Sequence, residues 1–440
     1  MEWQFALLFI FGGLILLLLT GLPVTIAFMI INVIGLYFFW GGAGSLGQLI
    51  LSMKESVKSF VLLPFPLFIL LGEVLFQSGM AGRAIDVIDM WLGRVPGRLS
   101  LLAVASGAIL ASVSGSGVAS AALLASTLVP EMEKRGYKTP MSVGPVLGAG
   151  GIAMIIPPSG DIVLLASLAY VSVGKLLVAG IMPGILMGIN YGIYVVGRCY
   201  FQPQLAPPYK VPPIPLLKKI TATVVNSVPV AIIIFLVTGV IILGIATPSE
   251  AAAMGALGAF ILAACYRRLN WRIIKASILA AGRITVMLFT ILLGAMAFSQ
   301  ILAYTGAVKA LVTLVTSLPV SPVVTLIGMM VLILILGCFM DEIAILLMML
   351  PIYMPIVHAL GFNVFWFLIL YLINMEMGLT TPPFGLILFV VKGVLPPDRK
   401  MSDLYKAAAP YLVCDAIAMT LIIAFPQIAL WLPSIMIRVR

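Results

Sequence analysis

Residues 144–166 read GPVLGAGGIAMIIPPSGDIVLLA, a stretch apolar enough to lie in a bilayer and yet unable to form one continuous helix. It carries Pro157 and Pro158 near its centre, and proline removes a backbone donor and clashes with the preceding turn. Backbone groups freed in this way are tolerated in a membrane only where protein buries them or where they line a watery cavity. The sequence therefore predicts a broken helix over residues 141–170, with a binding site at its interruption.

A second stretch of the same kind, NMEMGLTTPPFGLILFV, occupies residues 374–390. Its Pro382 and Pro383 correspond to Pro157 and Pro158, and the sequence distance from Pro157 to Pro382 defines a repeat interval. The same interval relates other marked positions, namely Pro130 with Pro355, Gly136 with Gly361, and Pro23 with Pro248. Two repeats with interrupted helices in corresponding places indicate a secondary transporter. The alternative is that the two proline pairs mark ordinary membrane kinks.

The repeat divides the chain into two inverted halves, each with a re-entrant hairpin and a broken helix. We predict a first inverted repeat over 1–200 (hairpin about 100–130, broken helix 141–170), a cytoplasmic linker over 201–225, and a second inverted repeat over 226–440 (hairpin about 321–358, broken helix 363–390). The centre of the first hairpin, residues 112–117, is rich in glycine and serine. The alternative there is a single helix that uses small residues for close packing.

The composition predicts an all-α polytopic membrane protein, because 62% of the 440 residues are hydrophobic and only 9% are charged. The formal net charge of +10 lies mostly in short loops, where it sets topology, so nucleic-acid binding is not indicated. With the densest basic cluster, residues 267–275, in the cytoplasm, the N-terminus is periplasmic and the two hairpins open to opposite sides. We expect a multi-pass protein of the bacterial inner (cytoplasmic) membrane.

Signatures of enzymes are missing from the sequence. The four cysteines are scattered without metal or disulfide spacing, and the single histidine, His358, lies near an expected membrane boundary. No P-loop, kinase motif or Ser-His-Asp pattern appears. We therefore predict a non-enzymatic protein without a cofactor other than a coupling ion.

A cation site within lipid needs oxygen ligands, which hairpin tips and unwound helices supply as carbonyls and hydroxyls. Sodium suits such a shell. The first predicted sodium site consists of Ser112, Ser114, Ser116, Ala153, Ile156 and Pro157. The second consists of Gly337, Asp341, Gly378, Thr380 and Thr381. Half-helix N-termini at the same tips can hold a substrate carboxylate, which defines a substrate region of Ser116, Ser159, Asp341 and Pro382.

Three carboxylates lie in apolar segments, where an ionisable group is a candidate for function. Asp341 either helps the cation or carries a proton, and the alternative is that it caps the helix beginning at Glu342. Glu73 and Glu376 each have either a direct transport role or a structural one, pairing with a basic group or capping a break.

Seven stretches, in this order along the chain, resemble the large membrane (permease) subunit of tripartite ATP-independent periplasmic (TRAP) transporters, within the ion-transporter superfamily. They are residues 21–28, 114–137, 155–159, 172–184, 247–253, 337–355 and 378–385. The hairpin tip departs from the family's Gly-Ser-Ser, since Gly117 follows Ser116. The resemblance implies an elevator-type transporter with a scaffold domain and a transport domain. It also implies sodium symport of a small organic acid, with a small four-helix membrane subunit and a periplasmic substrate-binding protein as partners.

Two other functional interpretations are compatible with the sequence. One is a self-sufficient sodium- or proton-coupled carrier of the dicarboxylate or citrate type, which needs no partner protein. The other is a channel or a membrane scaffold, which moves nothing against a gradient. Dependence of uptake on a sodium gradient and on a binding protein separates the three.

Overall fold

The computed structural model describes residues 3–58, 60–93, 95–114, 117–208 and 214–436, of which 43, 57, 60, 111–114 and 153 are described by backbone alone. These residues form helices and no strands, which confirms the predicted all-α class. Within them, six helices are long and apolar enough to cross a membrane, and the number is seven if one bent pair of helices is counted as a single span. The protein is a multi-pass membrane protein.

The first half contains a series of helices that ends in one long helix. They are α1 (Trp3–Leu7), α2 (Gly13–Leu19), α3 (Val24–Phe39), α4 (Leu46–Val57), α5 (Pro64–Gln77), α6 (Met80–Leu92), α7 (Arg98–Ser114), α8 (Gly117–Lys134), α9 (Thr139–Ser142), α10 (Gly144–Ile155), α11 (Gly160–Leu168) and α12 (Val173–Phe201). The bent pair is α5 and α6, which meet at 66° where Gly79 adopts a positive φ.

The second half follows the same order. Its helices are α13 (Leu216–Ala222), α14 (Val228–Ile242), α15 (Pro248–Cys265), α16 (Trp271–Tyr304), α17 (Ala307–Ser317), α18 (Pro322–Gly337), α19 (Glu342–Ala359), α20 (Val364–Thr380), α21 (Leu386–Val394), α22 (Met401–Ala424) and α23 (Gln427–Ile435). Helix α19 begins and ends one repeat interval after α8 does, and α20 ends one repeat interval after α10 does. The predicted linker is partly helical, because the chain from Leu216 to Ile242 forms one continuous span.

Both proline pairs interrupt helices. Helix α10 ends at Ile155 and α11 begins at Gly160, while α20 ends at Thr380 and α21 begins at Leu386. The first break is closed by Ser159, whose hydroxyl donates to the Met154 carbonyl (2.6 Å) and accepts from the amide of Ile162 (3.3 Å). This is an N-cap, and it gives the second half-helix a defined start.

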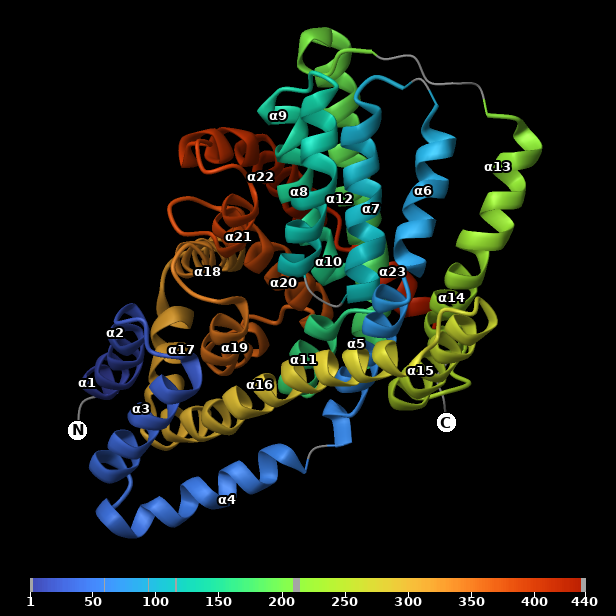
Figure 1. Cartoon of the computed structure of the whole chain (residues 1–440). Helices are drawn as coiled ribbons and strands as arrows, with labels where there is room; N and C mark the ends of the chain where they lie inside the picture. The colour runs from blue at the N-terminus through green and yellow to red at the C-terminus, as the bar shows by residue number, and fades with distance from the viewer. Residues whose placement is uncertain (1–2, 59, 94, 115–116, 209–213, 437–440) are drawn as a thin grey trace.

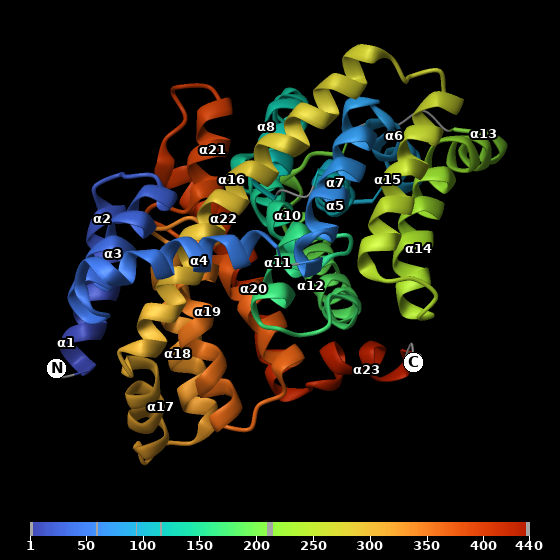
Figure 2. The same cartoon turned by 90° about the horizontal axis from the view of Figure 1, so that it is seen from below.

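Helices α4 and α16 pack against each other across one end of the molecule, and we call this pair the bar (Figures 1 and 2). Ser52 on α4 donates a hydrogen bond to the side-chain oxygen of Gln300 on α16. Asn32 of α3 donates to the carbonyl of Gly294, also on α16, at 2.6 Å. Buried polar groups of neighbouring helices thus pair with one another, as an interior without water requires.

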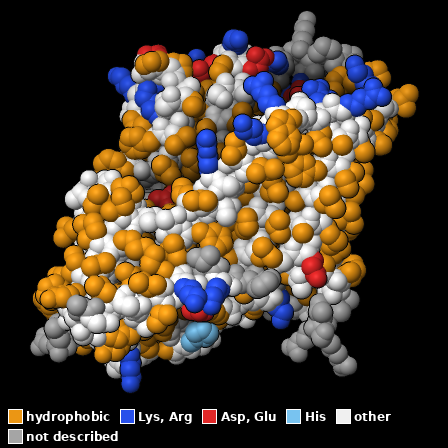
Figure 3. Space-filling model, turned by 60° about the horizontal axis from the view of Figure 1, so that its bottom comes forward, with side chains coloured by type: hydrophobic (Ala, Val, Ile, Leu, Met, Phe, Trp, Pro, Cys, Tyr) orange, Lys and Arg blue, Asp and Glu red, His pale blue; other side chains and the backbone are white. Residues whose placement is uncertain are grey.

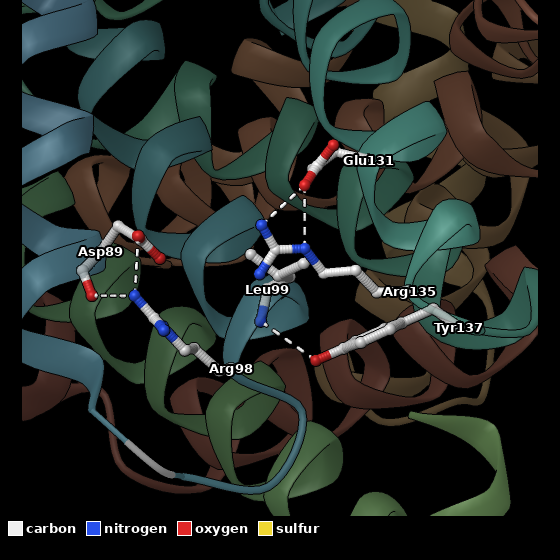
Figure 4. Close-up of polar contacts among 6 residues, drawn as sticks. All are labelled: Asp89, Arg98, Leu99, Glu131, Arg135 and Tyr137. Carbon is white, nitrogen blue, oxygen red and sulfur yellow. Dashed lines mark hydrogen bonds and ion pairs between the residues drawn. The ribbon is translucent and has the colours of Figure 1, made fainter. Parts of the chain in front are cut away.

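The base of the first hairpin is tied by polar contacts, which Figure 4 shows. Arg98 pairs with Asp89 at 2.7 Å, the amide of Leu99 donates to the hydroxyl of Tyr137 at 3.4 Å, and Arg135 pairs with Glu131 at 2.6 Å. Arg399, just before α22, reaches Glu133 of α8 at 2.5 Å. These contacts anchor the ends of α7 and α8 to α6 and to the second half.

Helix α20 lies at the centre of the bundle, and every residue from Trp366 to Thr380 is buried. It packs against α10, α12, α18 and α22. One of its polar side chains, Asn374, donates a hydrogen bond to the carbonyl of Met330 on α18 at 2.5 Å. The outer surface is mostly apolar on the face in Figure 3, where Lys and Arg gather mainly along the upper rim. The broken helix is therefore held inside a bundle with a lipid-compatible exterior.

Candidate functional site

The second hairpin and the second broken helix meet backbone to backbone. A Cβ on Gly337, the last residue of α18, would lie 2.7 Å from the Cα of Gly378 on α20, and a Cβ on Gly378 would lie 2.8 Å from the Cα of Gly337. Only glycine at both positions permits this approach, because neither backbone can turn away. Two residues of the second predicted sodium site are thus in contact.

Aromatic packing joins the hairpin tip to the helix break. The ring of Phe339, between α18 and α19, lies 5.7 Å from that of Phe384, which follows the second proline pair. The carbonyl of Pro383 accepts a hydrogen bond from the hydroxyl of Tyr405 of α22 at 2.7 Å. Pro382 is half-buried beside it. The tip and the break therefore form one local structure.

Asp341 caps α19. Its Oδ2 accepts a hydrogen bond from the amide of Ile343 at 3.1 Å, and its backbone is extended, as at other N-caps. The capping alternative is thus observed. One carboxylate oxygen is sufficient for this bond, so capping leaves the charge of the group available for a second role.

Thr380 and Thr381 close the last turn of α20. The hydroxyl of Thr380 donates to the carbonyl of Met377 at 3.2 Å, and that of Thr381 donates to the same carbonyl at 2.6 Å. Each hydroxyl therefore uses its proton locally and keeps its lone pairs. An oxygen in that state can accept from a donor or bind a cation.

Asp161 was missed in reasoning from sequence. It lies in the first turn of α11, directly after the first break, and its carboxylate interacts electrostatically with Asp341 and Glu342. The cluster thus joins the first broken helix to the second hairpin. The signal was present in the sequence, since Asp161 is a carboxylate in an apolar stretch, as Asp341 is.

Within the described residues, these three carboxylates form no ion pair, and one oxygen of Glu342 is buried without a hydrogen-bond partner. Helices α11 and α19 contain no lysine or arginine. The same part of the chain holds no group of three His, Cys, Asp or Glu side chains suited to a metal ion. A cation here would therefore depend on backbone carbonyls and hydroxyls as well.

The first predicted sodium site lies largely beyond what the structure describes. Ser116 is outside the described residues, as are the side chains of Ser112, Ser114 and Ala153. Ile156 directly follows the last residue of α10 and packs against Gly184 of α12. Pro157 follows it, buried, at the break. Ser159, predicted in the substrate region, is 1% exposed and acts as the cap described above.

A cavity of about 400 Å³ lies between α16, α19 and the end of α11. Its lining is mostly apolar and comes from the end of α11, from α16 and from α19, with Tyr170, Met296, Leu347, Met354 and His358 among its residues. The apolar lining offers few groups for directional contacts between α19 and α16 on this side.

The chain matches a family described as the tripartite ATP-independent periplasmic transporter, DctM component, over residues 11–428. The C4-dicarboxylate TRAP transporter large permease protein DctM of Pseudomonas aeruginosa is 32% identical over 393 residues, which are 89% of this chain and 90% of that protein. The ectoine TRAP transporter large permease protein TeaC of Halomonas elongata is 29% identical over 426 residues, 96% of this chain and 97% of that protein.

Among solved structures, the YdaH transporter of Alcanivorax borkumensis superposes with a TM-score of 0.63. The match covers 89% of each chain at 14% sequence identity. At that identity the likeness concerns the fold, which is that of a membrane transporter.

Proposed function

The chain belongs to the family of TRAP transporter large permease subunits, and on this premise we propose that it takes up a small organic acid by sodium-coupled, binding-protein-dependent symport. It is a subunit of a secondary transporter and not an enzyme. Large permeases of this family normally work with a small membrane subunit and a periplasmic binding protein. We propose both as its partners, and the inner membrane as its location.

The cluster of Asp161, Asp341 and Glu342 is the observation that supports sodium coupling. Carboxyl groups near one another repel when more than one is ionised, and these three lie at two helix starts away from any described ion pair. A monovalent cation relieves that repulsion, and the carbonyls at the Gly337–Gly378 contact with the hydroxyls of Thr380 and Thr381 supply oxygen ligands. We propose that sodium binds there and that the substrate carboxylate is bound next to it, at Pro382.

Two features support inverted repeats and an elevator motion. Gly151 of α10 lies against Glu376 of α20, and these residues are one repeat interval apart. When two repeats are related by a two-fold axis, a residue can touch its counterpart in the other repeat only close to that axis. The contact of Gly151 with Glu376 therefore fits a two-fold axis that passes between α10 and α20. The apolar cavity beside α16 fits an elevator motion in which the second hairpin, α18 and α19, slides along α16. Such shear between packed helices requires that few directional bonds hold them together.

Reconstitution tests the proposal. The chain, its small subunit and its binding protein are placed in liposomes, and accumulation of a labelled C4-dicarboxylate, ectoine and other small carboxylates is measured. We expect accumulation with an inward sodium gradient and none with a potassium gradient of equal size. Uptake without the binding protein would favour a self-sufficient carrier, and flux only down the substrate gradient would indicate a channel.

A substitution at Thr381 tests the second sodium site. Thr381→Val removes the hydroxyl at nearly constant volume, whereas Thr381→Ser retains it. We expect the valine variant to need several times more sodium for half-maximal stabilisation against heat, because one neutral hydrogen-bonding group contributes about 1 kcal/mol. The serine variant should resemble the unsubstituted chain. Equal sodium dependence in both variants would remove the hydroxyl from the site.

A further inference from the structure

A pair of carboxyls lies inside the bundle, separate from the cluster of Asp161, Asp341 and Glu342. Glu376 on α20 is 0% exposed and Asp415 on α22 is 1% exposed. Asp415 accepts a hydrogen bond from the hydroxyl of Tyr191 on α12. Both oxygens of Glu376 are buried without a hydrogen-bond partner in the described structure. The two carboxyls interact electrostatically.

The backbone of α10 is shaped to the Glu376 side chain. A Cβ on Gly151 would overlap its carboxyl group, so only glycine leaves room for it. The counterparts of the two acids one repeat interval earlier are Gly151 and Asn190, neither of which carries a charge. Asn190 is also close by, because its amide donates to the carbonyl of Cys414 at 3.3 Å. Both carboxyls therefore belong to the second half of the chain. They lie on α20 and α22, which pack against their first-half counterparts α10 and α12.

Among the residues that the structure describes, no basic group is available to neutralise the pair. Helices α10, α18 and α23, which pack against α20, contain no titratable side chain. The lysine and arginine of α12 and the lysine of α22 lie toward the helix ends, namely Lys175, Arg198 and Lys406. Lys392 of α21 is bound to the carbonyls of Pro396 and Pro397. On α19, Glu342 belongs to the cluster at the breaks, Tyr353 bonds the Met329 carbonyl, and His358 lines the cavity beside α16.

An ionised carboxylate in such a place is strongly disfavoured, because the described residues offer Glu376 no hydrogen-bond donor and no basic partner. Asp415 has a donor in Tyr191 and tolerates a negative charge better than Glu376 does. Two neighbouring carboxyls with unequal surroundings settle into one acid and one carboxylate. We propose that Glu376 is a proton-binding site, which holds one exchangeable proton beside Asp415 at the contact between α10 and α20. The bound proton allows these helices to pack closely.

Infrared spectroscopy of the full chain in lipid nanodiscs tests this. At neutral pH in sodium buffer, we expect the carbonyl band of a protonated carboxyl without a hydrogen bond. Glu376→Gln should remove that band, Asp415→Asn should retain it, and Glu55→Gln, at an exposed glutamate on α4, should leave it unchanged. Labelling with ¹³C-carboxyl glutamate should shift the band, and labelling with ¹³C-carboxyl aspartate should not, so the test survives if Glu376→Gln does not fold.

Three results would overturn the proposal. The first is the absence of such a band at neutral pH. The second is a band that follows the aspartate label or disappears with Asp415→Asn, since the proton would then belong to Asp415. The third is a band seen in choline buffer and abolished by sodium, which would make the pair a sodium site.

Discussion

Asp341→Asn is expected to abolish sodium-driven uptake while the protein still reaches the membrane. Asparagine keeps the shape of the side chain and can accept the bond from the Ile343 amide, so α19 retains its cap. It removes one charge from the cluster with Asp161 and Glu342. Loss of one charged interaction costs about 1.5–3 kcal/mol, so sodium should bind roughly ten- to a hundredfold more weakly.

The measurement compares uptake over a range of sodium concentrations at matched protein levels in the membrane. Asp398→Asn is the matched control, because Asp398 is an exposed aspartate before α22. Uptake by the Asp341 variant close to that of the control at every sodium concentration would leave capping as the only role of this residue.

Gly378→Ala is expected to have the second-largest effect, on both stability and sodium binding. The added methyl group would lie 2.8 Å from the Cα of Gly337, and a main chain cannot rotate aside as a side chain can. Overpacking of this kind typically costs about 1–3 kcal/mol. We expect a lower melting temperature and loss of stabilisation by sodium, because α18 and α20 must separate at the carbonyls of the proposed site.

Gly328→Ala on α18 is the control for that variant. A Cβ at Gly328 meets no atom within 4 Å, and alanine favours a helix over glycine by up to about 1 kcal/mol. This variant should be as stable as the original chain or more stable, with unchanged sodium dependence. If Gly378→Ala behaved in the same way, the glycine contact would have no part in the site.

Much of the fold could be predicted from interactions between residues that are close in the sequence. The all-α membrane class follows from the length and apolarity of the segments, which depend little on the partners of each helix. The two breaks follow from proline, which acts on its own turn, and the ends of α8 and α19 keep the repeat interval seen in the sequence. The capping role of Asp341 could also be predicted from the sequence, because a cap bonds to backbone amides only two or three residues away.

Contacts between the halves were decided by the tertiary structure. The repeat interval aligns Gly151 with Glu376 as counterparts, but it does not tell whether counterparts touch. It likewise gave no reason to place Asp161 near Asp341 and Glu342, since these residues belong to opposite halves. Periodicity and proline positions describe each helix by itself, whereas the place where two helices cross depends on the fit of all side chains along both. The sequence alone thus determined which helices break, and the packing of α10, α11, α18 and α20 determined which residues meet at the breaks.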